Sequence, residues 1–231
     1  GNLEDVTFVF PNRRSGLFFQ RYLGAEITKP IFSPKIITIT QLFEQLAKLT
    51  PADSFALLLK LYLIYKEKTG SEETFDTFMF WGQMLLADFA DITKYDVNAQ
   101  LLFSNLHDLK LLDASFDYLT EEQKEVIRTF WEQFDNANYN SQARTKFWNI
   151  WVHLADIMTA FNETLLSQNM AYPGLIQSEA IKGLEKGLCD EEVIDKNVVF
   201  VGFNALTLCE HRLFTYYKKH ARVLFFWDYN G

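Results

Sequence analysis

The positions of the strand-like segments limit the possible folds of this chain more than any other feature. Short β-branched or aromatic runs occur twice near the start and twice near the end of the 231 residues. They are TFVF (7–10), KIITIT (35–40), NVVFVGF (197–203) and RVLFFWD (222–228). None alternates cleanly between apolar and polar residues. Continuous apolar strands are typical of parallel sheets that helices cover on both faces.

The residues between these runs predict a helical block. Apolar residues recur at intervals of three and four in 54–70, 75–92, 119–134 and 144–168, and a shorter helix is expected after Pro173. Gly70 is a suitable stop for the first helix, and Thr120 with Gln123 has the spacing of a capping box. We therefore expect an α/β core made of 1–50 and 187–231, with 51–186 inserted as a helical subdomain.

Composition excludes several classes of protein. With 48% hydrophobic residues, the chain can bury a sizeable core, yet no apolar run is long enough to span a membrane. The acidic start GNLEDV lacks the pattern of a signal peptide. Two cysteines are typical of a reduced, cytoplasmic protein, and the four histidines do not cluster as metal ligands. The last predicted strand ends almost at the last residue, so we expect a fragment of a longer protein.

The stretch FVFPNRRSGLFF (8–19) has the order of a strand, a phosphate-binding loop and a helix. An active P-loop reads G-x-x-x-x-G-K-[ST], in which backbone N–H groups surround the phosphates and the hydroxyl binds Mg²⁺. On this template Pro11 and Gly16 occupy the glycine positions. Leu17 and Phe18 replace the lysine and the hydroxyl residue. The stretch predicts a degenerate P-loop, or else an ordinary strand–turn–helix.

Other parts of an active nucleotide site are also missing. Arg13 and Arg14 could contact a phosphate, but they cannot replace a metal ligand. An active NTPase carries an acidic pair after its second core strand, whereas NVVFVGF ends at Phe203 without an acid. Glu210 comes later, and its spacing from Thr207 predicts a capping box. We therefore expect no ATP or Mg²⁺ site, no other cofactor and no ATPase activity in this chain.

Four segments in order resemble the AddB family, the helicase-like subunits of bacterial helicase–nucleases that process DNA double-strand breaks. They are FVFPNRRSGLFFQRYL, PKIITITQLFEQL, VVFVGFNALTLCEHRLF and VLFFWDYN. The chain resembles in particular the long AddB-like proteins of Bacteroidetes-type bacteria that are identified as PD-(D/E)XK nucleases. The N-terminal region of this family is similar to the first motor domain of UvrD-type helicases. The resemblance spans the whole chain, with the helical block as the inserted subdomain.

The most specific motif of this resemblance is strand–G-F-x-x-[FL]-T-x-x-E. Its positions are occupied here by Gly202, Phe203, Leu206, Thr207 and Glu210. Asp228 matches the aspartate of a G-D-x-x-Q motif, whereas Trp227 and the missing glutamine depart from that motif.

The resemblance also implies contacts with single-stranded DNA. PKIITITQLFEQL matches the segment that touches the strand in such motors, so Thr38 and Thr40 are candidates beside Arg13 and Arg14. Thr40 also precedes QLFEQLAKL, and we interpret it first as the N-cap of that helix. The tryptophans at helical spacing are expected in the core rather than as stacking platforms. They are Trp81, Trp131, Trp148 and Trp151.

The predicted fold is an α/β, P-loop NTPase-like but degenerate parallel sheet, covered by helices and interrupted by a large helical insertion. The resemblance implies a non-catalytic module that scans single-stranded DNA and docks an AddA-like motor subunit in the cytoplasm. The expected partners are that subunit and single- or double-stranded DNA ends, without a membrane. For the longer protein, the resemblance implies exonuclease activity in a C-terminal PD-(D/E)XK domain beyond residue 231.

Two other functions remain open at this point. An unrelated α/β enzyme would use Asp228 or the carboxylates of CDEEVID (189–195) as acid–base groups, although no nucleophile and base are paired in the sequence. A protein–protein adaptor without DNA contact is compatible with the net charge of −8. A local basic groove beside Arg13 and Arg14 would favour DNA binding over the adaptor.

Overall fold

The computed structural model describes residues 3–104, 150–189 and 195–228. The chain forms two compact units, one of residues 1–49 and 176–231 and the other of residues 50–175. The first boundary lies next to the one that we expected between residues 50 and 51. The second falls inside helix α10 (Pro173–Glu185), earlier than the expected boundary after residue 186. Helical periodicity does not reveal this boundary because α10 is one continuous helix.

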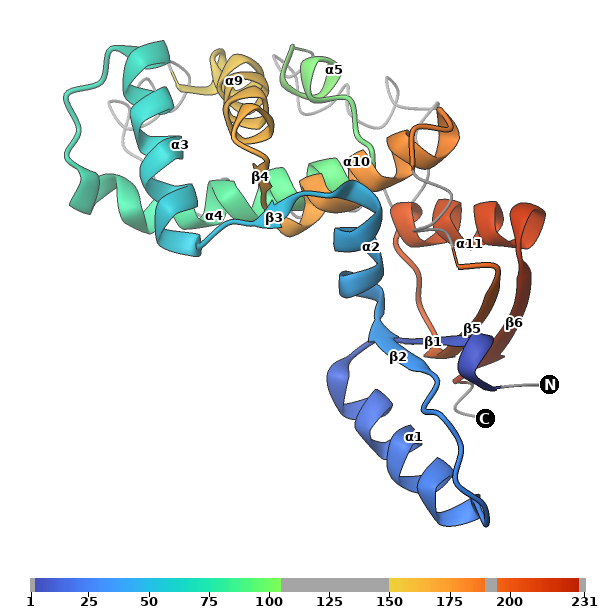
Figure 1. The fold of residues 1–231 in the computed structure, drawn as a ribbon. Helices are drawn as coiled ribbons and strands as arrows, with labels where there is room; N and C mark the ends of the chain where they lie inside the picture. Colours follow the sequence, from blue (N-terminus) through green and yellow to red (C-terminus); the bar gives the residue numbers. More distant parts are fainter. Residues whose placement is uncertain (1–2, 105–149, 190–194, 229–231) are drawn as a thin grey trace. The chain divides into compact units, whose positions relative to one another are not determined.

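The first unit contains a four-stranded parallel sheet in the order β2-β1-β5-β6 (Figure 1). Its strands are β1 (Thr7–Phe10), β2 (Lys35–Thr38), β5 (Asn197–Phe203) and β6 (Arg222–Trp227). A short 3₁₀ turn, η1 (Leu3–Asp5), precedes β1. The prediction of an α/β protein with a parallel sheet is confirmed, although β2 and β6 end earlier than expected.

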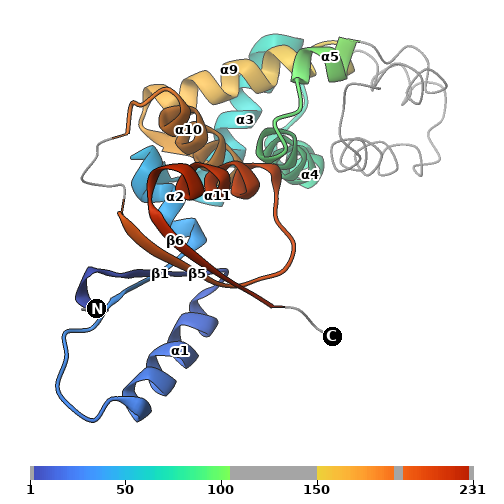
Figure 2. The ribbon, with the colours of Figure 1, turned by 90° about the vertical axis from the view of Figure 1, so that its right-hand side faces the viewer.

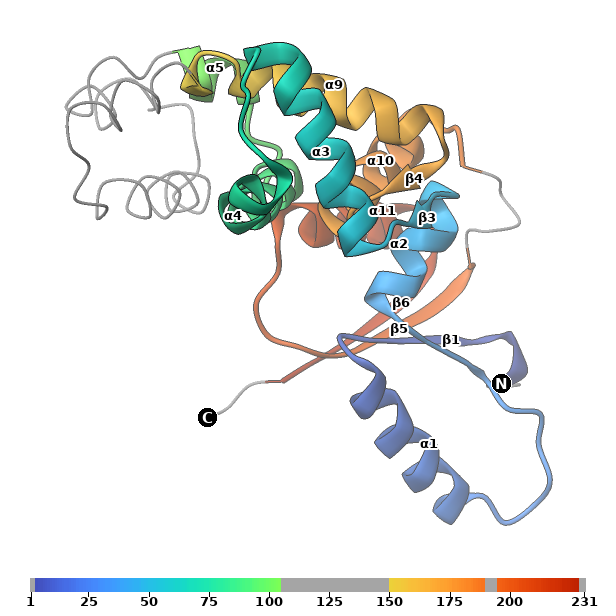
Figure 3. The same cartoon turned by 90° about the vertical axis from the view of Figure 1, so that its left-hand side faces the viewer.

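Helices cover the two faces of this sheet. Helix α1 (Arg13–Glu26) lies on one face, and α2 (Ile39–Ala47) and α11 (Leu208–His220) lie on the other (Figures 2 and 3). The chain passes from β1 to β2 in one direction and from β5 to β6 in the opposite direction. Right-handed crossovers in opposite directions place their helices on opposite faces, which accounts for the positions of α1 and α11.

Aromatic contacts fix both layers. On the α1 face, the rings of Phe8 and Phe10 lie 4.6 Å and 5.3 Å from the ring of Phe19 in α1. On the α11 face, the ring of Phe200 lies 4.3 Å from that of Phe214. Since successive residues of a strand point to opposite faces, the continuous apolar strands supply side chains to both layers.

Strand β5 contains an irregularity at Gly202 that changes which face Phe203 occupies. Phe200 and Phe203 both contact the ring of Phe214, at 4.3 Å and 5.2 Å, although residues three apart in a regular strand face opposite ways. The pairing with β6 shifts register between Val201 and Phe203, and Gly202 has a φ of +79°. Glycine adopts this conformation without steric cost. In the G-F pair of the sequence motif, Gly202 therefore allows the shift that turns Phe203 toward α11.

The second unit is mostly helical. It contains α3 (Ser54–Thr69), α4 (Phe75–Lys94), α5 (Ala99–Ser104), α9 (Leu154–Ser167) and a short parallel pair, β3 (Thr50–Pro51) with β4 (Met170–Ala171). The first two predicted helices are confirmed, and Gly70 closes α3 with a φ of +65°. Of the predicted helix 144–168, residues 144–149 lie outside the described residues, and a turn at 152–153 interrupts the described part before α9. The predicted helix 119–134, with Thr120 and Gln123, lies outside the described residues.

Aromatic side chains form much of the core of the second unit. The ring of Phe78 lies 5.1 Å from that of Tyr65 and 4.5 Å from that of Trp81. Trp151 is buried and donates a hydrogen bond of 3.1 Å from Nε1 to the backbone oxygen of Phe103. The core prediction is confirmed for Trp151, whereas Trp81 packs against the core rings but is only half-buried. Trp131 and Trp148 lie outside the described residues. Within the described ranges, every helix is too short or too polar to cross a membrane.

Candidate functional site

The carboxyl ends of the four strands form the edge of the sheet at which ligands usually bind. The strand order reverses between β1 and β5, and in open α/β sheets the crevice at such a reversal is the common binding site. A side-chain carbon added to Gly202 would lie 4.0 Å from Cδ of Pro11, so the residue that follows β1 lies next to the end of β5. The predicted site residues lie at this edge or in the first two turns of the helices that begin there.

The connection between β1 and α1 is much shorter than a phosphate-binding loop. Strand β1 ends at Phe10 and α1 begins at Arg13, which leaves only Pro11 and Asn12 between them. Oδ1 of Asn12 accepts hydrogen bonds from the backbone nitrogen of Ser15 at 2.9 Å and from its hydroxyl at 3.2 Å. This N-cap starts the helix early. Of the two alternatives that the sequence left open, this two-residue connection fits an ordinary strand–turn–helix better than a phosphate loop.

Gly16 lies inside α1 and packs against the sheet. A Cβ atom at this position would lie 3.2 Å from Cγ2 of Ile36 and 3.6 Å from the Phe10 ring. This glycine therefore allows the helix to approach the sheet closely. Leu17 and Phe18, which occupy the lysine and hydroxyl positions of the template, are both exposed in the second turn of α1.

The charges of α1 are arranged against its own dipole. Arg13 and Arg14 are exposed in the first turn, which contains no acidic residue, and the last residue of the helix is Glu26. Helix N-termini favour anions and C-termini favour cations, by about 0.3–1 kcal/mol for each charge. Helix stability therefore does not explain two arginines at this end. Their guanidinium groups and the first backbone N–H groups of the helix favour an anionic ligand.

The two candidate threonines of the second segment have different roles. Thr38 is the N-cap of α2: Oγ1 accepts from the backbone nitrogen of Gln41 at 3.2 Å, and Oε1 of Gln41 accepts from the backbone nitrogen of Thr38 at 2.9 Å. The prediction that Thr40 caps this helix is wrong. The residue three positions after Thr40 is Phe43, which is buried and has no acceptor for a capping box. Thr40 is exposed in the first turn of α2.

The predicted capping box at the start of α11 is confirmed. Oγ1 of Thr207 accepts from the backbone nitrogen of Glu210 at 3.3 Å, and Oε2 of Glu210 accepts from the backbone nitrogen of Thr207 at 2.8 Å. The carboxylate of the motif is therefore bound to its own helix end. Asp228 is exposed directly after β6, and its backbone nitrogen donates to the oxygen of Phe203 at 3.0 Å.

The carboxylates proposed for an unrelated enzyme are not brought together where the structure describes them. Asp195 pairs at 3.0 Å with Lys35, the first residue of β2, and therefore lies at the amino edge of the sheet. Asp228 lies at the opposite, carboxyl edge. Residues 190–194 of CDEEVID are outside the described ranges. Among the residues that are described, no three His, Cys, Asp or Glu side chains form a group that could hold a metal ion.

Sequence reasoning missed two exposed residues of α1, Arg21 and Tyr22. They follow Phe18 by about one helical turn. The signal that could have found them was the 3.6-residue period, which places both residues on the same side of the helix as Phe18 and away from Gly16.

No model of a protein family matches the chain, and a comparison with curated proteins finds no match either.

Proposed function

We propose that this chain is a non-catalytic, helicase-like module of an AddB-type DNA-repair helicase–nuclease and binds single-stranded DNA at the carboxyl edge of its sheet. The observation that carries the proposal is the pair of exposed arginines, Arg13 and Arg14, at the N-terminus of α1. Their positive charge is unfavourable beside the positive end of the helix dipole, and the negative charge of DNA phosphates would offset this repulsion. The order of strands and helices supports a helicase-like origin of the sheet.

Several features favour a nucleic-acid strand over a bound nucleotide. The two-residue connection before α1 cannot surround a triphosphate, and Leu17 stands where the phosphate-binding lysine of a P-loop would be. Glu210 is held by the capping box rather than turned toward a metal. A DNA strand needs only cations and backbone N–H groups along its phosphates, and this edge offers both. Thr40, exposed in the first turn of α2, provides a hydroxyl at the same edge.

Fluorescence anisotropy with a labelled oligonucleotide of twenty thymidines tests this proposal. The double variant Arg13→Gln/Arg14→Gln should bind more weakly. The slope of log K against log salt should flatten by about 0.7 for each phosphate that the variant no longer neutralises. The control is Lys219→Gln/Arg222→Gln, which removes the same charge from exposed residues near the amino end of β6. No binding by the parent chain, or an equal reduction in both variants, would contradict the proposal.

Calorimetry with ATP and Mg²⁺ tests the non-catalytic part of the proposal. The parent chain should show no binding. Leu17→Lys/Phe18→Ser restores the side chains of a P-loop, but it should not restore binding because the loop itself is too short. Mg²⁺-dependent ATP binding by the parent would show that a nucleotide site lies elsewhere in the chain.

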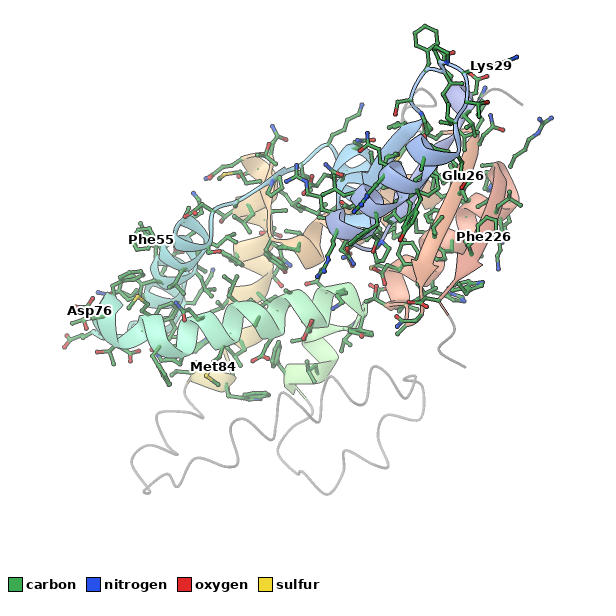
Figure 4. The ribbon with its side chains drawn as sticks, turned by 90° about the horizontal axis from the view of Figure 1, so that it is seen from below. Glu26, Lys29, Phe55, Asp76, Met84 and Phe226 are labelled. Carbon is green, nitrogen blue, oxygen red and sulfur yellow. The ribbon has the colours of Figure 1, made fainter. Side chains whose placement is uncertain are left out.

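We also propose that strand β6 contributes to docking of an AddA-type motor subunit. Phe225 and Trp227 contact Phe214 of α11, so the alternate residues Leu224 and Phe226 lie on the α1 face, where they are 60% and 58% exposed. Figure 4 shows Phe226 on this face. Exposed apolar residues on an edge strand are typical of protein interfaces. Co-purification with the motor subunit should be abolished in Phe226→Glu and retained in Arg222→Glu on the same strand.

A further inference from the structure

We infer that the outer face of helix α1 is a base-stacking surface for single-stranded DNA, formed by Phe18 and Tyr22 with Arg14 and Arg21. This inference rests on the proposed DNA-binding function and extends it from phosphates to bases. All four side chains are exposed; Phe18 and Tyr22 are 45% and 68% exposed. Figure 4 views the molecule from the side of this helix and labels Glu26, its last residue.

The composition of this face is unusual for a surface helix. A helix that packs one side on a sheet normally carries mixed charges and polar residues on its other side. Helix α1 already buries Gly16 and packs Phe19 against the sheet, yet it also exposes two large aromatic rings, Phe18 and Tyr22, to solvent. The helix contains three arginines and one acidic residue, Glu26, within a chain of net charge −8. Arginine interleaved with exposed aromatic rings matches the surfaces that bind single strands.

The spacing of the rings favours an unstacked single strand over a duplex. Phe18 and Tyr22 are four residues apart, which corresponds to about 6 Å along the helix axis. Successive bases in B-DNA are about 3.4 Å apart along one strand, so two adjacent bases can reach both rings only when they are spread apart. The guanidinium of Arg14 lies 5.7 Å from the centre of the Phe18 ring. The guanidinium therefore covers one face of the Phe18 ring, and a base would stack on the other face.

The experiment compares two oligonucleotides of equal length on the full chain. One contains twenty thymidines and the other has the same sugar–phosphate backbone without bases. The parent chain should bind the thymidine strand more tightly, because only that strand can stack. Alanine at Phe18 or Tyr22 should each raise Kd for the thymidine strand by about fivefold or more. In the double variant the two oligonucleotides should bind with similar affinity.

Two controls separate stacking from other effects. Tyr22→Phe keeps the ring and should retain the affinity of the parent. Phe80→Ala removes an aromatic residue that is 79% exposed on α4 in the other unit, and it should leave Kd unchanged. Circular dichroism of each variant should match that of the parent, since these side chains are outside the core.

The possible failures are distinguishable. If neither oligonucleotide binds, the proposed function itself is wrong. If both bind equally and binding still depends on Arg13 and Arg14, the phosphate site stands and the stacking surface is refuted. If alanine at Phe18 and Tyr22 changes only the mass of the particle in light scattering, the face is a protein interface and the inference is overturned.

Discussion

Replacing Thr38 with alanine should destabilise the first unit, whereas the same change at Thr40 should not. Thr38 Oγ1 accepts the hydrogen bond from the backbone nitrogen of Gln41, which is one of the N–H groups that the start of α2 cannot pair internally. Loss of an N-cap threonine costs about 1 kcal/mol, within a range of about 0.5–2 kcal/mol. Thr40 lies inside the helix with an exposed side chain, so its hydroxyl caps nothing.

The measurement is urea unfolding followed by far-ultraviolet circular dichroism, with hydrogen exchange of the α2 amides to locate the effect. In a thermal melt of a chain of this length, 1 kcal/mol would correspond to about 2–4 °C in Tm. Thr38→Ser keeps the acceptor and should recover most of the stability. Gln41→Ala removes the other bond of the box, so its effect should not add to that of Thr38→Ala. An equal or larger loss of stability in Thr40→Ala would refute this account of the helix start.

Two further predictions concern a strand glycine and a buried carboxyl group. Gly202→Ala should cost about 1–2 kcal/mol because its φ is +79°, whereas Gly24→Ala, in open space within α1, should gain about 0.5–1 kcal/mol in the same urea experiment. Burial, together with the neighbouring Asp91 carboxylate, raises the pKa of Asp88 from 3.8 to about 7. The folded state therefore holds a proton that the unfolded state releases, so stability should fall as pH rises from about 4 to about 7. Tm measured against pH should be flatter for Asp88→Asn; an unchanged profile would show that Asp88 ionises normally.

The strands and most helix ends could be predicted because their signals are local. The continuous apolar runs at 7–10 and 197–203 can be satisfied only where both faces of a strand are covered, and this predicts a parallel sheet with helices. Gly70 and the pair Thr207–Glu210 mark helix ends through bonds between residues a few positions apart. For such features the interacting groups lie within one short stretch of sequence.

The candidate site was predicted only in part, because its geometry depends on contacts between distant segments. On the P-loop template Gly16 has a phosphate-binding role, whereas its position against Ile36 of the neighbouring strand gives it a packing role. The helix starts after Thr38 rather than after Thr40. Three positions after Thr38 lies Gln41, which supplies an acceptor, whereas three positions after Thr40 lies Phe43, which is buried. In both cases the local sequence allows two answers, and burial against another segment selects one.

Residue type and short-range spacing were enough to predict the class of fold, the succession of strands and helices along the chain and the loss of the P-loop side chains. The order of strands within the sheet, its reversal between β1 and β5, and the exposed face shared by Arg14, Phe18 and Tyr22 became known only from the folded chain. A side chain belongs to the core when another segment covers it and to the surface when none does, and the sequence alone does not say which segments meet. Pairing of β1 with β5 joins residues nearly two hundred positions apart, and no local pattern specifies that contact.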